Sequence, residues 1–293
     1  MPDWNNTGFY DLNVHESCLE PAVRVVTLQT LYNLGYRTIA VNQVVEVDAH
    51  PETKKKKKKG EPRDVWADVL PEPCNLQELR KLAVDLNVKN VTFLNRLTLI
   101  FASQDSLHRY LKSSNFKKYD IIAVIPTTTP ALMFTCSNLD ADIIGFNPQN
   151  KLTLRMNRKI YTQLVDKGYH FELTYSSAIQ DSTKRKNLIH LSHLYHTFGK
   201  SKNIIFSSAA ESHMFIRSPY DVTSLGLLFG LNELQSKNAI LHNPKNVILN
   251  AIGRQHGKAV MMVENTEPMD LDEPIVLDSD EDPDEPAQKK SKL

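Results

Sequence analysis

The chain has 293 residues, of which 41% are hydrophobic and 24% are charged, and its formal net charge is +1. This length and composition allow one large buried core and exclude a protein that is disordered throughout. Its three cysteines, Cys18, Cys74 and Cys136, are widely spaced without a CxxC pair, which indicates neither a disulfide framework nor a zinc site. Neither the N-terminal residues nor the proline-interrupted apolar run at 121–134 has the pattern of a signal or membrane segment. We therefore expect an intracellular protein in a reducing compartment, with no membrane contact.

The small net charge hides two regions of opposite charge. Residues 1–263 contain 32 basic and 23 acidic residues, whereas residues 264–286 contain eleven acidic residues and no lysine or arginine. A body with a charge of +9 indicates a polyanionic partner, and the alternative is that its charge only aids solubility. The acidic segment has no aromatic residue, which predicts disorder. We expect one folded domain over residues 1–263 and a disordered tail over 264–293 that ends in a basic cluster.

Apolar runs of strand length alternate with helix-period segments along the body, which is the pattern of a parallel β/α fold. A first helix over residues 25–32 is predicted to end at Gly35. Successive right-handed units of this kind close into a barrel or form an open sheet, and the periodicity does not separate the two. In both cases the loops that follow the strands form the functional face. The predicted strands span residues 9–14, 38–45, 91–101, 120–125, 142–146, 171–175 and 203–207.

One segment interrupts the alternation. Residues 46–73 contain six consecutive lysines, 54–59, together with several prolines, which predicts a mobile surface insertion before a helix near 76–86. The lysine run is typical of a nuclear import signal, a nucleic-acid clamp or a solvated loop. We favour an interaction role because runs this dense are seldom neutral.

The richest region is 165–231, where two strand, loop and helix units follow one another. After the strand at 171–175 and the loop SSAIQD, a helix opens with Lys184, Arg185 and Lys186, and we expect Asp181 to cap it. Each cation at the positive end of a helix costs about 0.3–1 kcal/mol. An anionic partner would compensate for this cost.

The second unit leads from the strand at 203–207 into a helix with a capping-box signature. Ser218 is the expected N-cap, Pro219 the first helical residue and Asp221 the reciprocal acid. Arg217 is thereby placed just outside the helix. Gly226 and Gly230 fall within the apolar helix pattern, where close helix packing explains them better than phosphate binding does, because no Walker-type lysine follows.

The sequence contains no convincing catalytic or metal-binding set, and no cofactor is indicated. The histidines at 190, 193 and 196 fall beside the apolar face of their helix, and the serines near 207–212 lack a GxSxG elbow. Glu172 lies in a strand whereas Asp181 caps a helix, which disfavours catalysis by paired carboxylates. Metal-dependent phosphoesterases built on β/α barrels often place His-x-His at the end of their first strand, but here the position reads Asp11-Leu12-Asn13.

Eight strings that follow one another along the chain are specific enough to identify a family. They are YDLNV, LYNLGYRTIAVNQVV, FLNRLTLIF, YDIIAVIPTT, LDADII, FELTYSSAIQDSTKR, NIIFSSAAE and IRSPYDVTSLGLLFGL. In this order they resemble the TIM-barrel protein subunits of ribonuclease P and ribonuclease MRP. The resemblance covers nearly all of residues 8–252, and it is strongest at 165–231 and weak in the lysine insertion and the tail.

The resemblance implies a TIM-like β/α barrel and a non-catalytic, RNA-binding assembly subunit of a ribonucleoprotein whose RNA is catalytic. The implied partners are ribonuclease P RNA, MRP RNA, the other protein subunits and precursor tRNA within the complex. The implied activities of the particle are 5′-leader removal from precursor tRNA and cleavage of precursor ribosomal RNA, in the nucleus and nucleolus. The alternative function is a metal-dependent phosphoesterase of the same architecture.

Recognition of a folded RNA through phosphate and 2′-hydroxyl groups needs dispersed cations on a rigid surface. Arg96 is one candidate, although its apolar neighbours make a buried ion pair the alternative. We expect the candidates to lie on one face and to contact the RNA backbone. The predicted RNA-binding residues are Arg96, Lys184, Arg185, Lys186 and Arg217.

The acidic tail contains a possible docking motif. Ile275, Val276 and Leu277 precede a run of acids and resemble SUMO-interacting motifs, which add a strand to a partner's sheet. The final Ser-Lys-Leu matches a peroxisomal signal, whereas the lysines around it resemble a basic import cluster. The family resemblance favours the nucleus.

Overall fold

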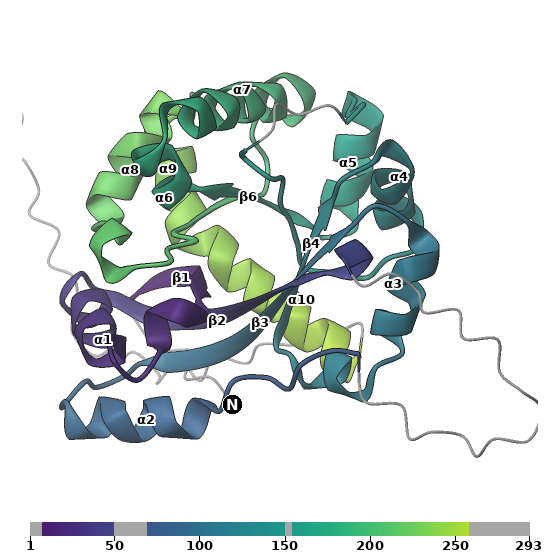
Figure 1. The fold of residues 1–293 in the computed structure, drawn as a ribbon. Coiled ribbons are helices and arrows are strands. Elements are labelled where there is room, and N and C mark those ends of the chain that lie inside the picture. The colour runs from purple at the N-terminus through teal and green to yellow at the C-terminus, as the bar shows by residue number, and fades with distance from the viewer. Residues whose placement is uncertain (1–7, 50–68, 150–153, 258–293) are drawn as a thin grey trace, which may run out of the picture. The chain divides into compact units, whose positions relative to one another are not determined.

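The computed structural model describes residues 8–49, 69–149 and 154–257. Its centre is one sheet of seven parallel strands in sequence order, surrounded by helices (Figure 1). The strands are β1 (Phe9–His15), β2 (Tyr36–Glu46), β3 (Thr92–Phe101), β4 (Ile121–Pro126), β5 (Ile143–Ile144), β6 (His170–Thr174) and β7 (Ile204–Ser207). Each of the seven predicted strands is therefore confirmed, although β5 is shorter than expected.

The helices alternate with the strands as the sequence pattern predicts. The α-helices are α1 (Arg24–Asn33), α2 (Leu76–Asp85), α3 (Gln104–Leu111), α4 (Thr129–Ser137), α5 (Arg158–Asp166), α6 (Tyr175–Gln180), α7 (Ser182–Gly199), α8 (Pro219–Leu228), α9 (Glu233–Ile240) and α10 (His242–His256). The 3₁₀ turns are η1 (Glu16–Leu19), η2 (Val47–Ala49), η3 (Ser114–Lys118) and η4 (His213–Phe215). None of these helices is long and apolar enough to cross a bilayer.

The first and last strands meet and nearly close the sheet into a barrel. The residues just after β7 reach β1, where the Ala209 N–H donates to the Asn13 carbonyl over 2.8 Å and the His15 N–H donates to the Ala210 carbonyl over 3.2 Å. Val14 and Ala210 form a parallel bridge at the same point. The fold is therefore the TIM-like barrel that the family resemblance implied.

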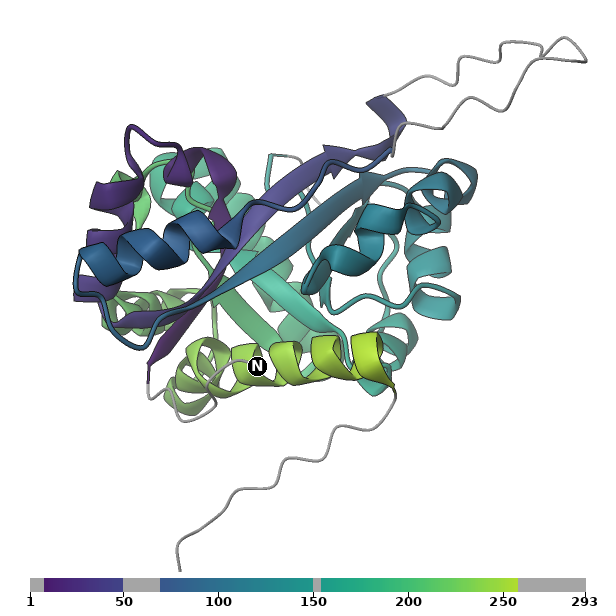
Figure 2. The same cartoon turned by 90° about the horizontal axis from the view of Figure 1, so that it is seen from below.

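Helix α10 closes the end of the barrel at which the strands begin. Figure 2 shows α10 lying across the strands. Its polar side chains bind backbone carbonyls just before or at the strand starts: Asn250 donates to the Gly168 carbonyl, and Arg254 donates to the Asp120 carbonyl, both over 3.0 Å. Its apolar face packs inside the barrel. The buried residues of this layer are Leu12, Ala40, Leu94, Ile121, Ala123, Ile143, Ile205, Val247, Ile248 and Ala251.

A second apolar layer lies between the strands and the outer helices. Tyr161 of α5 stacks on Phe171 of β6 with ring centroids 4.1 Å apart, and Tyr195 of α7 packs against the Phe171 ring at 5.0 Å. The periodicity of this helix predicts a core face of Leu188, Leu191, Tyr195 and Phe198; the first three are buried, and Phe198 is partly buried against the core. The three histidines at 190, 193 and 196 are exposed beside that face, as the periodicity predicts.

Three local predictions in the region 165–231 need correction. The segment SSAIQ is not a loop but part of α6, a helix of six residues that precedes the Asp181 cap of α7. Ser218 occupies the N-cap position of α8, but its side chain makes no capping hydrogen bond, so the capping box does not form. Gly226 packs closely against Ser236 as expected, whereas Gly230 lies beyond the end of α8 with a φ of +79° and serves as a turn residue.

Candidate functional site

The end of the barrel opposite α10 is open. There the strand ends and the loops that follow them line a cavity of about 300 Å³. Its lining is mixed: one part is apolar and another is formed by polar side chains from β1, β2, β3 and β6. Binding sites of parallel β/α folds are formed at this end, because the loops after the strands converge there.

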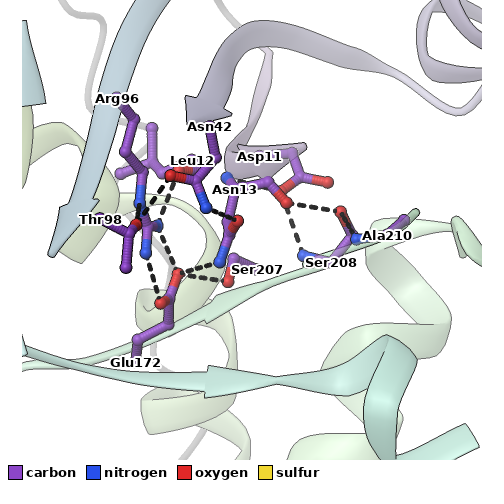
Figure 3. A network of polar contacts seen from close by, with 10 residues as sticks. All are labelled: Asp11, Leu12, Asn13, Asn42, Arg96, Thr98, Glu172, Ser207, Ser208 and Ala210. Carbon is purple, nitrogen blue, oxygen red and sulfur yellow. Dashed lines mark hydrogen bonds and ion pairs between the residues drawn. The ribbon is translucent and has the colours of Figure 1, made fainter. Parts of the chain in front are cut away.

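The floor of the cavity contains a buried ion pair between β3 and β6 (Figure 3). The Nη1 and Nη2 atoms of Arg96 donate to the two carboxylate oxygens of Glu172 over 2.5 and 2.6 Å. The two side chains are 1% and 3% exposed. Arg96 also donates to the Leu12 carbonyl and the Thr98 hydroxyl, which satisfies further guanidinium N–H groups. The geometry is bidentate, the arrangement in which arginine binds carboxylates most strongly.

Short polar side chains complete the network around this pair. Asn13 donates to Glu172 over 3.1 Å and accepts from the Asn42 amide over 2.8 Å, while Ser207 donates to Glu172 over 2.6 Å. Thr98 donates to the carbonyl oxygen of the Asn42 side chain over 2.7 Å. The network thereby links β1, β2, β3, β6 and β7 across the barrel, as Figure 3 shows.

An irregularity in β1 brings its Asn13 into this network. The pairing of β1 with β2 changes register between Asp11 and Val14. Side chains of a regular strand alternate between its faces, but here Leu12 packs inside the barrel in the apolar cluster that includes α10, and its neighbour Asn13 also reaches inward to Glu172.

Glu172 is ionised in this site despite its burial. Burial by itself raises the pKa of a carboxyl group, but the Arg96 guanidinium and the hydrogen bonds from Arg96, Ser207 and Asn13 outweigh it, so the pKa of Glu172 lies below its ordinary value. Asp11 shows the opposite balance, because burial raises its pKa more than its hydrogen bonds from Ser208 and Asn13 lower it. Within the part of the chain that the structure describes, one carboxylate oxygen of Asp11 has no hydrogen-bond partner.

Comparisons with known proteins decide the family. The family model "RNase P subunit p30" matches residues 8–256. The chain belongs to the RNase P subunit p30 family. This confirms the resemblance read from the sequence strings, and it extends over all the strands and helices of the barrel.

Individual relatives agree with this assignment. The chain is 33% identical over 253 residues to ribonuclease P protein subunit p30 of Mus musculus, a match that covers 85% of this chain and 87% of the relative. It is 27% identical over 235 residues to the ribonuclease P/MRP protein subunit RPP1 of Saccharomyces cerevisiae, covering 80% and 74% of the two chains.

A solved structure shares the fold. A chain in the cryo-EM structure of archaeal ribonuclease P with mature tRNA superposes with a TM-score of 0.56 at 12% identity, and the match covers 83% of this chain and 96% of that one. At this level of identity the likeness establishes the fold of this p30-family member.

Arg96 is not an accessible cation in this p30-family barrel. Its guanidinium is buried beneath the cavity and bound to Glu172, so the structure favours the buried ion pair, which was the alternative to RNA contact. The sequence suggests an ion pair from the apolar neighbours of Arg96, but it does not identify Glu172 as the partner. The participation of Asn42, Thr98 and Ser207 also escaped prediction, because a short polar residue in a strand gives no signal of its own.

The other predicted RNA-binding residues lie on or near α6 and α7. Lys184 is half-buried and lines the same cavity as Arg96. Arg185 and Lys186 are exposed, and the Arg185 Nε atom donates to the Ala178 carbonyl of α6 over 2.7 Å. As predicted, Asp181 caps the helix by accepting from the Lys184 N–H over 2.7 Å.

Arg217 is held in place by two tyrosine hydroxyls, one of them from α6. The Tyr175 hydroxyl accepts from its backbone N–H over 3.4 Å, and the Tyr36 hydroxyl donates to its carbonyl over 2.9 Å. Its guanidinium folds back onto the Met214 and Ile216 carbonyls. Arg185 and Arg217 therefore contact the same short helix, but neither of them lines the cavity. The common surface of the four cations stays a prediction.

Two further sequence predictions concern metal binding and the segments at 54–59 and 264–293. Within residues 8–49, 69–149 and 154–257, no group of three or more histidine, cysteine or acidic side chains is arranged to hold a metal ion. The SUMO-like motif at 275–277, the tail and the lysine run at 54–59 lie outside the described residues.

Proposed function

We propose that this chain is a non-catalytic RNA-binding and assembly subunit of a ribonuclease P/MRP ribonucleoprotein, in which the RNA carries out the cleavage. The family match over residues 8–256 is the observation that carries this proposal. The chain would support 5′-leader removal from precursor tRNA and, in the MRP particle, cleavage of precursor ribosomal RNA.

The chemistry of the barrel mouth, the open end opposite α10 that contains the cavity, supports a binding role. In this position a metal-dependent hydrolase needs several anionic or imidazole ligands with free lone pairs. Here the central carboxylate, Glu172, is neutralised by Arg96 and accepts hydrogen bonds from Asn13 and Ser207 as well. A fixed guanidinium at the same point would repel a metal cation, and no observation favours the phosphoesterase alternative.

The first turn of α7 is the proposed contact with the RNA backbone. It contains no acidic residue to offset Lys184, Arg185 and Lys186, apart from the Asp181 cap that precedes it. RNA phosphates would supply the missing negative charge at a helix end whose partial charge is already positive. Arg217, positioned by Tyr36 and Tyr175, is the proposed second contact.

A purification identifies the particle directly. The full-length chain is tagged and purified from its own cells at moderate salt, and the associated RNA is sequenced. We expect ribonuclease P RNA and MRP RNA together with several other protein subunits. Recovery of the chain free of any stable non-coding RNA would overturn the proposal.

A second experiment tests the α7 contact. Lys184 and Lys186 are both changed to alanine, while Arg185 is kept because it bonds to α6. We expect weaker binding to the particle RNA and a slope of log affinity against log salt that is smaller by about 0.7–0.9 for each lost phosphate contact. The matched control is K81A/K89A, which removes two exposed lysines in and after α2. Equal affinity and slope in the two double variants would refute the contact.

We also propose that the chain acts in the nucleus and nucleolus, and that its Ile275–Leu277 motif binds SUMO. The composition of the tail supports the second proposal, because a β-prone stretch precedes a run of acids. Imaging the chain with an N-terminal tag tests the location and keeps the C-terminal Ser-Lys-Leu free. Titration of a tail peptide into SUMO tests the motif, and unchanged chemical shifts would exclude it.

A further inference from the structure

The mouth cavity has the size and the walls of a site for a flat ring with polar edges. Its volume of about 300 Å³ lies at the lower end of the range for small-ligand sites. Ile100, Ile125 and Phe146 give it apolar surface from β3, β4 and the segment after β5, and Val44 of β2 stands at 41% exposure beside them. A nucleobase needs such surface for its faces and hydrogen-bonding groups for its edge.

The floor supplies these groups. A side-chain amide carries two N–H donors and a guanidinium carries five. The described contacts use one N–H of Asn13, one of Asn42 and four of Arg96. Each of these buried side chains therefore keeps one donor without a partner among the described residues. An occupant of the cavity with acceptor atoms on its edge could satisfy these donors.

Charge determines which way round a nucleotide would enter. At the floor the positive charge of Arg96 is cancelled by Glu172, so a phosphate gains little there. At the rim Lys184 and the positive end of α7 attract a phosphate, although Glu211 and His15 also line the rim. The base is thus favoured inside, with the phosphate at Lys184.

We propose that the barrel mouth receives the base of one unpaired nucleotide of the bound RNA. This inference rests on the proposed RNA-binding function and adds a defined pocket to it. The pocket would act beside the backbone contacts of α7, because Lys184 belongs to both.

The test uses a residue at the rim whose enlargement fills the pocket. Val44→Trp places a large ring in the cavity from a position that is already partly exposed. The matched control is Val84→Trp, at a 77% exposed position on α2 that does not line the cavity. Thermal unfolding of both variants verifies that the barrel folds.

Nucleoside monophosphates are titrated into the three proteins by NMR or calorimetry. We expect saturable binding to the unaltered chain and to V84W, and at least tenfold weaker binding to V44W. No binding of any of the four monophosphates to the unaltered chain, or equal binding to V44W, would overturn the pocket.

Particle RNA distinguishes this inference from the function on which it rests. We expect V44W to bind the RNA several-fold more weakly with an unchanged salt slope, whereas K184A/K186A reduces the slope. Full affinity of V44W together with weak binding by K184A/K186A would refute the pocket and leave the RNA-binding function standing. If both variants bound the RNA with full affinity, the pocket and the RNA-binding function would both be refuted.

A crosslinking measurement does not depend on any variant. RNA that carries 4-thiouridine is bound to the unaltered chain, irradiated and digested, and the attached peptides are identified. We expect crosslinked peptides that contain Val44, Ile125 or Phe146. Crosslinks confined to α7 would contradict the pocket.

Discussion

The two halves of the barrel interior contain different types of side chain. The half beneath, where the strands begin, is filled by aliphatic side chains and by Val247, Ile248 and Ala251 of α10. The half above, where the strands end, contains the Arg96–Glu172 pair and the short polar side chains around it, and it opens into a cavity. The apolar half gains free energy by excluding water, whereas the polar half must satisfy every buried charge to avoid a large penalty. The two ends therefore depend on different interactions: packing at the base and satisfied charges at the open end.

Each end also has its own ion pair, and the two differ in burial. At the base, Arg254 and Asp142 are 3.0 Å apart, with Arg254 partly exposed. Burial raises the pKa of Asp142 more than Arg254 lowers it, whereas Arg96 and the surrounding hydrogen bonds hold the pKa of Glu172 down in spite of burial. The contributions of the two carboxyl groups to folding stability should therefore change with pH in opposite directions.

The largest expected effect comes from breaking the upper pair. Glu172→Gln leaves the buried charge of Arg96 uncompensated, and we expect the free energy of unfolding to fall by about 3–5 kcal/mol. Urea denaturation measures the loss. The double variant R96M/E172L, which removes both charges, should regain most of the lost stability. A loss below about 1 kcal/mol for E172Q would show that the polar half tolerates an unpaired charge.

The corresponding change in the lower half removes volume and leaves charge untouched. Ile248→Ala opens a cavity between α10 and the strands, and we expect a loss of about 2–5 kcal/mol by the same measurement. Ile248→Val is the matched control, with an expected loss of about 0.5–1.5 kcal/mol. If both variants were equally stable, α10 would not be packed as the structure shows.

A smaller effect is expected from a single hydrogen bond to the upper pair. Ser207→Ala removes the hydroxyl that donates to Glu172, and we expect a loss of about 1.5–3 kcal/mol because the acceptor is charged. In the E172Q background the same substitution should cost less, since its charged acceptor is gone. Equal costs in both backgrounds would argue against a coupled network.

The smallest effect is a change in pH dependence. The pKa of Glu172 is lowered on folding, so its contribution to stability is present above about pH 4.5 and is lost as the pH falls through the folded value. The pKa of Asp142 is raised on folding, so this group stays protonated to a higher pH in the folded state than in the unfolded state. Its contribution to stability therefore falls as the pH rises above 3.8.

Unfolding free energies between pH 3 and pH 7 can separate the two carboxyl groups. R96M/E172L should lose stability less steeply than the unaltered chain when the solution is acidified, and Asp142→Asn should lose it more steeply. The same sign of change in both variants would contradict the opposite pKa directions.

Most of the fold could be predicted from the sequence because strand length and apolar content are local signals. All seven strands and the α7 core face were found in this way. Helix α6 was missed because its six residues are too few to show a period. The predicted cap at Ser218 failed because a capping signature does not fix the side-chain rotamer.

The candidate site was harder to predict because its contacts are long-range. Arg96 and Glu172 are 76 residues apart, and only closure of the barrel brings them together. The register change in β1 gives Asn13 its inward position, and no residue in this strand allows that change to be predicted from the sequence. Lys184 is a candidate from the sequence because cations at a helix N-terminus conflict with the helix dipole. The structure places it in the cavity lining, and its contact with RNA stays a prediction.

The position of α10 in the chain has a consequence for biosynthesis. The helix that seals the base is the last of the described helices to be translated, whereas Leu12, one of the residues it covers, is among the first. Until residue 256 has been made, the growing barrel exposes the aliphatic residues at its base to solvent and to other chains. A nascent chain of this kind is a natural substrate for chaperones, and truncation before His242 should yield an aggregating product.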